Sequence, residues 1–206
     1  MAVEPTTPKG LRTRGTILAA ARQVFSEVGY VEARMSDVVN ASGLSMGAVY
    51  RYFENKEDLF AQVIADLHEL LFEASRSPVS LQEDPYAALF EANRGYLALY
   101  HENRDLMRAF VESTAMEPRF LTIWWNMRER HVDRFVAVVR RLGMTELDGI
   151  DARTAAQAMA SLVEQSAYTW FAHHALNDTE VSVEEAARLV TRAWHLTFFA
   201  PDNRPT

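Results

Sequence analysis

The stretch that decides the fold spans residues 42–59 and reads SGLSMGAVYRYFENKEDL. Before it, the apolar pair Val38 and Val39 leaves room for only about two helical turns ahead of a break at Gly43. Beyond the break, Ser45 can accept a backbone N–H as the N-cap of a second short helix. A helix, a small-residue turn and a second short helix predict a helix-turn-helix, which places its second helix in a DNA major groove.

The second helix of this motif has an inner and an outer face. Val49 and Phe53 are spaced for burial, which leaves an outer face of four residues: Met46, Gly47, Tyr50 and Arg51. Gly47 lets a backbone approach closely, and Arg51 can bond a guanine edge or a phosphate. The spacing also allows a second interpretation, in which the tyrosines and Phe53 form a small aromatic core.

Asn55 and Asp58 resemble a capping box at the start of a long amphipathic helix. Lys56 stands in the first turn of that helix, beside N–H groups that favour phosphate. Taken singly, a lysine is more often an ordinary solvated residue, so its position after the turn carries the prediction that it binds the DNA backbone.

The whole chain predicts an all-α fold of about nine helices, with its seven prolines in the breaks. The first helix buries Ile17, Ala21, Val24, Phe25 and Val28, and Gly29 is expected as its left-handed C-cap. A fourth helix follows Asn55. Further helices are expected at about 84–101, 104–115, 119–142, 151–175 and 182–199.

Composition and charge divide the chain into three parts. We expect a disordered arm over residues 1–11, a helix-turn-helix DNA-binding domain over 12–57 and a ligand-binding and dimerisation domain over 58–206. The net charge of −7 disfavours a polyanionic partner, but residues 1–53 hold six Lys/Arg against four Asp/Glu. The basic charge is therefore local to the part predicted to bind DNA.

Several classes of protein are disfavoured. No apolar run approaches the length of a membrane span, and the first residues lack the pattern of a secretion signal, so we expect a cytoplasmic protein without membrane contact. The chain has no cysteine, and His173 and His174 point in divergent directions on a helix. We expect no metal, no cofactor and no enzymatic activity, because no catalytic motif is present.

The run from Met35 to Leu59, together with Gly29 and Tyr30, resembles the DNA-binding domain of the tetracycline-repressor (TetR) family. The signature is Ser-x-Gly-x-Val-Tyr-x-Tyr-Phe-x-Asn-Lys-Glu, which starts at Ser45. The resemblance covers about residues 12–60, and the later helices resemble the family only in number, length and helical character.

The resemblance implies a role for each matching residue. Phosphate contacts are implied for Ser45, Tyr50, Tyr52 and Lys56, and proximity to the bases for Met46, Gly47 and Arg51. The family's usual Thr-Thr pair before the second helix reads Ala33-Arg34 here, so the hydroxyl cap of that helix is missing. Arg34 either replaces the lost phosphate contact with a charged one or simply faces solvent.

The resemblance also implies an effector pocket enclosed by the fourth to seventh helices and part of the eighth. Aromatic, Met and Leu side chains suit an adaptable apolar pocket, and polar residues embedded among them need partners. The candidate ligand-binding residues are Leu67, Leu71, Phe90, Asn93, Tyr96, Met107, Phe110, Trp124, Arg128, Glu164, Gln165 and Tyr168. Ordinary core packing or interhelical hydrogen bonding explains any single one of them equally well or better.

The last two helices are implied to form a four-helix bundle with a second subunit. The apolar face of Val190, Trp194 and Phe198 has no obvious cover in the same chain and is the candidate dimer interface. The sequence thus predicts a homodimeric regulator, most simply a repressor, that binds double-stranded operator DNA and a small, largely apolar effector. An all-α enzyme or a helical carrier of an apolar molecule is the alternative, and it leaves the motif at residues 45–57 without a role.

Overall fold

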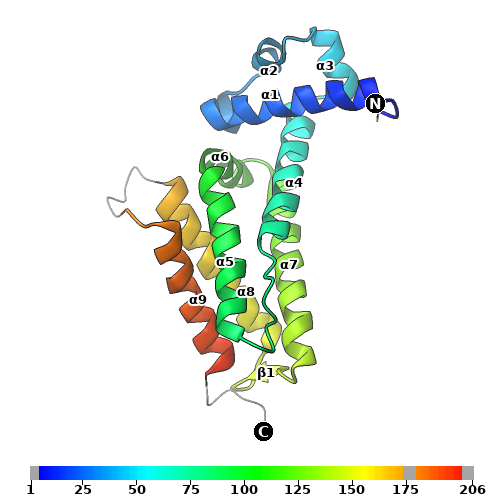
Figure 1. The fold of residues 1–206 in the computed structure, drawn as a ribbon. Helices are drawn as coiled ribbons and strands as arrows, with labels where there is room; N and C mark the ends of the chain where they lie inside the picture. The colour runs from blue at the N-terminus through cyan, green and yellow to red at the C-terminus, as the bar shows by residue number, and fades with distance from the viewer. Residues whose placement is uncertain (1–4, 174–179, 201–206) are drawn as a thin grey trace. The chain divides into compact units, whose positions relative to one another are not determined.

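The structure is a computed structural model that describes residues 5–173 and 180–200. Helices dominate these residues, as predicted, and the elements are drawn in Figure 1. They are α1 (Pro8–Glu32), α2 (Met35–Ser42), α3 (Met46–Tyr52), α4 (Lys56–Ala74), α5 (Pro85–Glu102), α6 (Arg104–Thr114), α7 (Pro118–Arg141), β1 (Glu146–Leu147), β2 (Ile150–Asp151), α8 (Ala152–Ala167), the π-helical turn η1 (Tyr168–Ala172) and α9 (Val183–Phe199). No helix in the described ranges is long and apolar enough to cross a membrane.

The chain folds into two compact units. The first contains the residues up to Glu69 and Asp105–Ile123, and the second contains Leu70–Arg104 and the residues from Trp124 onward. The boundary between the units therefore falls inside α4 and again inside α7, not at residues 57 and 58 where the sequence placed the domain division. α6 lies in the first unit because Phe110 packs against Phe60, with 6.5 Å between ring centroids.

α1 starts earlier than the sequence indicated. Thr7 is its N-cap, with its hydroxyl oxygen 3.1 Å from the backbone nitrogen of Gly10, and Pro8 occupies the first helical position, where its missing N–H is not needed. The arm expected over residues 1–11 is thus wrong for Pro8 to Leu11, which are helical. Residues 1–4 of that expected arm lie outside the described residues.

The far end of α1 is kinked where the sequence predicted its C-cap. Gly29 has φ +76°, a conformation that glycine adopts without a steric penalty, and helical residues resume until Glu32. Val28, expected on the buried face, is half exposed because the chain turns away immediately after it. The other four predicted core residues of this helix are buried.

The helix-turn-helix forms as predicted. Gly43 ends α2 in the left-handed conformation with φ +66°, and its N–H reaches the carbonyls of Val39 and Asn40. Ser45 then caps α3 by accepting the N–H of Ala48 at 3.3 Å. Asn55 caps α4 in the same way, accepting the N–H of Asp58 at 2.7 Å.

An aromatic cluster forms the core of the first unit. The Phe60 ring lies 4.6 Å from Phe25, 4.8 Å from Tyr30 and 5.2 Å from Phe120, measured between centroids. The rings of Tyr30 and Phe120 meet edge to face at 5.0 Å. Such pairs stabilise beyond their buried area, so the first turns of α4 are fixed against the end of α1.

In the second unit, α5 and α9 lie side by side (Figure 1). The buried hydroxyl of Thr191 on α9 accepts a hydrogen bond of 3.0 Å from the side-chain amide of Asn93 on α5. β1 and β2 form a short antiparallel hairpin whose turn residues, Asp148 and Gly149, both have positive φ, as a tight two-residue hairpin requires. The helix expected over 151–175 is α-helical only to Ala167 and continues as η1.

Gly95 lets α5 approach the end of α4 closely. A Cβ atom at Gly95 would lie 2.0 Å from the carbonyl oxygen of Ala74, a backbone atom that cannot turn aside. We therefore expect Gly95→Ala to lower the free energy of unfolding by about 1–3 kcal/mol. Gly15→Ala is the matched control, because a Cβ there meets nothing within 4 Å and should raise stability by up to about 1 kcal/mol. Urea unfolding measures both, and equal stability of the two variants would contradict this close contact.

Candidate nucleic-acid interface and ligand cavity

α3 presents the outer face that its sequence pattern predicts. Val49 and Phe53 are buried, whereas Met46 and Tyr50 are 43% and 45% exposed. Gly47 and Arg51 are exposed on the same side. The predicted inner and outer faces of α3 are confirmed, and the four residues predicted for groove contact lie together on an open surface.

Tyr52 and Ser45 border this face and also have local structural roles. Tyr52 is half buried and packs beside the start of α1, where a Cβ at Gly10 would lie 3.5 Å from its hydroxyl. Ser45 is exposed, and its hydroxyl oxygen accepts the capping hydrogen bond of α3. Its O–H hydrogen can still be donated to a phosphate.

Arg34 is the N-cap residue of α2 and is exposed. An arginine side chain cannot accept the capping hydrogen bond that a hydroxyl would accept. Instead, the backbone N–H of Arg34 donates to the carboxylate of Asp37 at 2.9 Å, which satisfies one donor at the start of the helix. The guanidinium group is therefore available for an external anion.

Lys56 holds the end of α1, a role that the sequence pattern did not suggest. Its ammonium group donates to the carbonyl of Tyr30 at 2.8 Å and to that of Val31 at 3.1 Å, and it lies 4.6 Å from the centroid of the Tyr30 ring. A lysine has three N–H donors, so one remains for a phosphate. The Tyr30 hydroxyl donates to Glu57 at 3.2 Å, and burial and that carboxylate raise the pKa of Tyr30.

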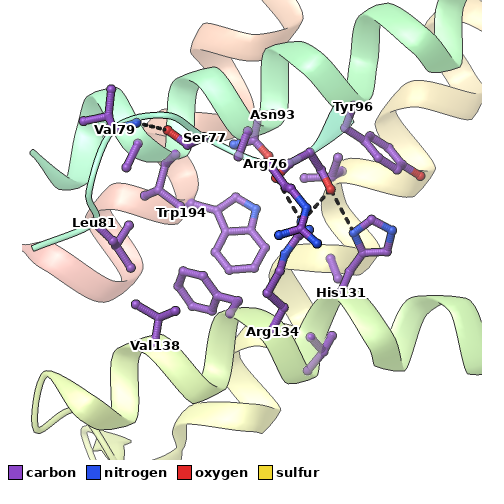
Figure 2. Close-up of a pocket in the computed structure, with 18 of the residues that line it drawn as sticks. Arg76, Ser77, Val79, Leu81, Asn93, Tyr96, His131, Arg134, Val138 and Trp194 are labelled. Carbon is purple, nitrogen blue, oxygen red and sulfur yellow. Dashed lines mark hydrogen bonds between the residues drawn. The ribbon is translucent and has the colours of Figure 1, made fainter. Parts of the chain in front are cut away.

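The second unit contains a partly open cavity of about 410 Å³ (Figure 2). Its walls come from the segment after α4 and from α5, α7, α8 and α9, and most of them are apolar. The apolar lining includes Val79, Leu81, Leu89, Val132, Phe135, Val138, Val163 and Trp194. The polar lining includes Arg76, Asn93, Tyr96, His131, Arg134 and Glu164. This size and composition are typical of a site for a small amphipathic molecule.

Three of the twelve ligand-binding candidates line this cavity: Asn93, Tyr96 and Glu164. The guanidinium of Arg128 donates a hydrogen bond of 2.5 Å to Glu164 and lies 4.3 Å from the centroid of the Trp124 ring. Two further candidates, Arg128 and Trp124, therefore lie behind a lining residue and do not line the cavity themselves. Burial raises the pKa of Glu164, and the hydrogen bond and charge of Arg128 oppose that rise.

The remaining candidates are not among the residues that line this cavity. Leu67, Met107 and Phe110 are buried in the first unit, where they fill its core. In the second unit, Leu71 is fully buried, Phe90 stacks on Tyr86, Gln165 is exposed and Tyr168 packs near His173. Helical periodicity marks all of these as inward or amphipathic, but it does not tell which inward residues face a void.

Sequence reasoning missed the polar centre of the cavity, at Arg134 and Ser75. The Arg134 guanidinium donates to the carbonyl of Phe72 at 2.8 Å, to the carbonyl of Ser75 at 2.9 Å and to the Ser75 hydroxyl at 2.5 Å. The same hydroxyl lies 3.3 Å from Nδ1 of His131. Burial first, and then the charges of Arg134 and Arg130, lower the pKa of His131 to about 4. The one signal in the sequence that could have pointed here is His131 itself, a polar residue in an apolar stretch.

The predicted dimer interface is wrong in its residues. Val190, Trp194 and Phe198 are buried within the subunit, because the Phe135 ring on α7 covers Trp194 at 4.6 Å and Phe198 at 4.8 Å. The exposed apolar side chains of α9 are instead Leu189 and Leu196, with Leu162 on α8. Among the described residues, no group of three metal-ligating side chains occurs, and His174 lies outside them.

Comparison with known proteins gives two kinds of similarity. Residues 17–63 match the family model described as bacterial regulatory proteins, tetR family. The regulator YdgC of Bacillus subtilis is 38% identical over 60 residues, which cover 29% of this chain and 31% of YdgC. The repressor BepR of Brucella suis is 31% identical over 94 residues, which cover 42% of this chain and 45% of BepR. The chain thus spans less than half the length of these curated relatives.

The fold is similar over nearly the whole chain. The crystal structure of a transcriptional regulator from Rhodococcus sp. Rha1 superposes with a TM-score of 0.73 at 24% identity, covering 90% of this chain and 95% of the other. The family match thus falls on residues 17–63, which contain the helix-turn-helix, whereas the similarity of fold extends over 90% of the chain.

The neutral state of His131 predicts a pH-dependent stability. Between about pH 6.5 and 4, the unfolded chain binds a proton at this histidine and the folded chain does not, so the free energy of unfolding falls as the pH is lowered through this range. His131→Gln, which keeps a polar partner for Ser75, should lose part of this dependence. Urea unfolding of both proteins at pH 7, 5.5 and 4 measures the difference, and a difference that stays constant with pH would contradict the burial of a neutral imidazole.

Proposed function

From the match of residues 17–63 to the model of the tetR family of bacterial regulatory proteins, we propose that the chain is a TetR-type, ligand-responsive repressor of transcription. The observation that carries the proposal is the open face of α3, where Met46, Gly47, Tyr50 and Arg51 stand over the buried Val49 and Phe53. A face of this size on the second helix of a helix-turn-helix suits insertion into a major groove. The proposed protein acts in the cytoplasm by binding DNA and a ligand, and it catalyses no reaction.

The DNA contacts are proposed residue by residue. Arg51, Met46 and Gly47 lie nearest the bases, while Tyr50, Tyr52, Ser45, Arg34 and Lys56 contact phosphates. Charge supports the second group, since Arg34 is exposed and Lys56 has a donor to spare. Phosphate contacts set the position of the protein on the duplex, and base contacts set the sequence that it prefers.

The proposed assembly is a homodimer formed through α8 and α9. Leu189 and Leu196 are 58% and 54% exposed on one side of α9, and Leu162 is exposed on the neighbouring α8. The two helices are in contact near Met159 and Thr197, whose sulfur and hydroxyl oxygen are 3.4 Å apart. Two helices that present apolar residues side by side suit isologous packing against the same pair in a second copy.

The proposed effector site is the cavity of the second unit. α4 is the element through which an effector would act, because Lys56 at its first turn contacts the end of α1 and Phe72 near its last turn contacts Arg134 of the cavity lining. A ligand that binds more tightly to one arrangement of the α4 end would then shift the population of conformations of the helix-turn-helix.

The DNA prediction concerns two substitutions with different consequences. Selection from a random duplex library should return an inverted repeat, as a two-fold dimer requires. Arg51→Ala should weaken binding and relax the preference at one position in each half-site, because a base contact is lost. Lys56→Ala should weaken binding to all sequences and lower its salt dependence.

Arg140→Gln, on the other unit, is the control with unchanged DNA binding. Binding constants measured by fluorescence anisotropy at several salt concentrations separate the two effects. Equal affinity and equal sequence preference in wild type, Arg51→Ala and Lys56→Ala would rule out the proposed interface.

The assembly prediction uses a buried and an exposed residue of the same helix. Leu196→Glu places a charge on the exposed face of α9 and should give a folded monomer by light scattering. Trp194→Glu places a charge inside the subunit and should cause unfolding or aggregation. A folded, fully dimeric Leu196→Glu protein would show that the dimer uses another surface.

A further inference from the structure

The indole N–H of Trp194 is a buried hydrogen-bond donor with no acceptor among the described residues. The side chain is 8% exposed and lines the cavity, with its ring packed against Phe135 and Phe198. Figure 2 shows the nitrogen edge of this ring turned toward Arg76 and Arg134. Because a buried indole N–H ordinarily has a partner, the cavity is missing an acceptor at this point.

Arg134 offers further donors at the same cavity. A guanidinium group has five N–H donors, and the described bonds of Arg134 engage Nη1 once and Nη2 twice, all with neutral oxygens of Phe72 and Ser75. Nε and one N–H of Nη1 are in no described bond. Within the described ranges no carboxylate forms an ion pair with this half-buried cation, and Glu73, whose charge acts on it, is itself paired with Arg76.

Two further guanidinium groups lie near Arg134. Three guanidinium groups lie around the ring of Phe72, with Arg130 at 4.0 Å, Arg134 at 4.1 Å and Arg76 at 5.7 Å from its centroid. Glu73 is engaged with Arg76 at 2.6 Å, and Arg128 offsets the charge of Glu164 across the cavity. Burial and the charges of Arg76 and Arg130 lower the pKa of Arg134, and Glu73 only partly opposes them.

We propose that the cavity binds an amphipathic monocarboxylate, an inference that rests on the effector role proposed above. The carboxylate accepts hydrogen bonds from the Trp194 indole and from Arg134, and the apolar body lies along Leu89, Val138 and Val163. One anion thereby satisfies the unpartnered N–H and neutralises the guanidinium. Charge-assisted hydrogen bonds of this kind are stronger than those between neutral groups, so the charge of the ligand is part of its recognition.

Calorimetric titration of the full chain with three ten-carbon probes tests the proposal. Decanoate carries the required charge, 1-decanol is neutral with the same body, and decylammonium carries the opposite charge. Decanoate should bind about tenfold or more tightly than 1-decanol, and decylammonium should bind more weakly than both. No binding of decanoate, or 1-decanol binding as tightly as decanoate, would overturn the proposal.

Variants locate the binding contacts. Trp194→Phe keeps an aromatic ring against Phe135 and removes only the donor, so decanoate affinity should fall about fivefold or more. Arg134→Gln should remove most of the preference for decanoate over 1-decanol. Arg140→Gln, which removes the same charge from the same helix outside the cavity lining, should leave both affinities unchanged.

The Arg134 variant also loses hydrogen bonds to the end of α4, so its fold is checked by circular dichroism. If the Arg134→Gln variant is unfolded, the decanoate affinity of the Trp194→Phe variant alone tests the proposed contact. Unchanged decanoate affinity in that variant would overturn the assigned contact.

Fluorescence anisotropy with the selected operator separates this proposal from the proposed function. Decanoate that binds without releasing DNA contradicts only the effector role. Release of DNA by a neutral compound, with no decanoate binding, contradicts only the ligand class.

Discussion

The rest of the structure depends on one kind of interaction that occurs at both ends of α4. At each end, a cationic side chain donates hydrogen bonds to backbone carbonyl oxygens. At the first turn, the ammonium group of Lys56 takes the carbonyls of Tyr30 and Val31 at the end of α1. At the last turn, the guanidinium of Arg134 takes the carbonyls of Phe72 and Ser75. The two contacts lie in different compact units, and one uninterrupted helix connects them. A cation suits both places because each engages carbonyls at a helix end, where the helix dipole is negative.

The two contacts differ in what else they can bind. Lys56 is half exposed beside the aromatic cluster of Phe25, Tyr30 and Phe60, and its remaining donor is open to an anion from solution. Arg134 lies in a cavity with largely apolar walls, where no described carboxylate forms an ion pair with it and the burial of its charge is costly. Each end of α4 thus offers an anion site, one suited to a DNA phosphate and one to an enclosed ligand. This arrangement offers a mechanism for the proposed regulation, because an anion bound at either site changes the hydrogen bonds at that end of α4.

The sequence predicted the helix-turn-helix well and the cavity poorly. Ser45, Asn55 and Gly43 act through their immediate neighbours, so their capping and turn roles follow from local pattern alone. Val49 and Phe53 follow from helical periodicity. The cavity depends on which inward side chains fail to fill the space between helices, and periodicity does not contain that information. For that reason Phe110 was assigned to a pocket although it fills a core, and Trp194 to a dimer interface although Phe135 covers it. Arg134 was missed because two of its three acceptors are backbone carbonyls, which leave no trace in a pattern of side chains.

The central claim is that the cavity and the DNA-reading face are coupled through α4, and reciprocity tests it most directly. A cavity ligand, identified by its loss of affinity in Trp194→Phe, is titrated by calorimetry into the protein with and without selected operator. Operator affinity is then measured with and without saturating ligand. The account predicts that each partner weakens the other by the same factor, typically about 5–150-fold. Ligand affinity that is identical in the presence and absence of operator would contradict the coupling, even if the protein binds both.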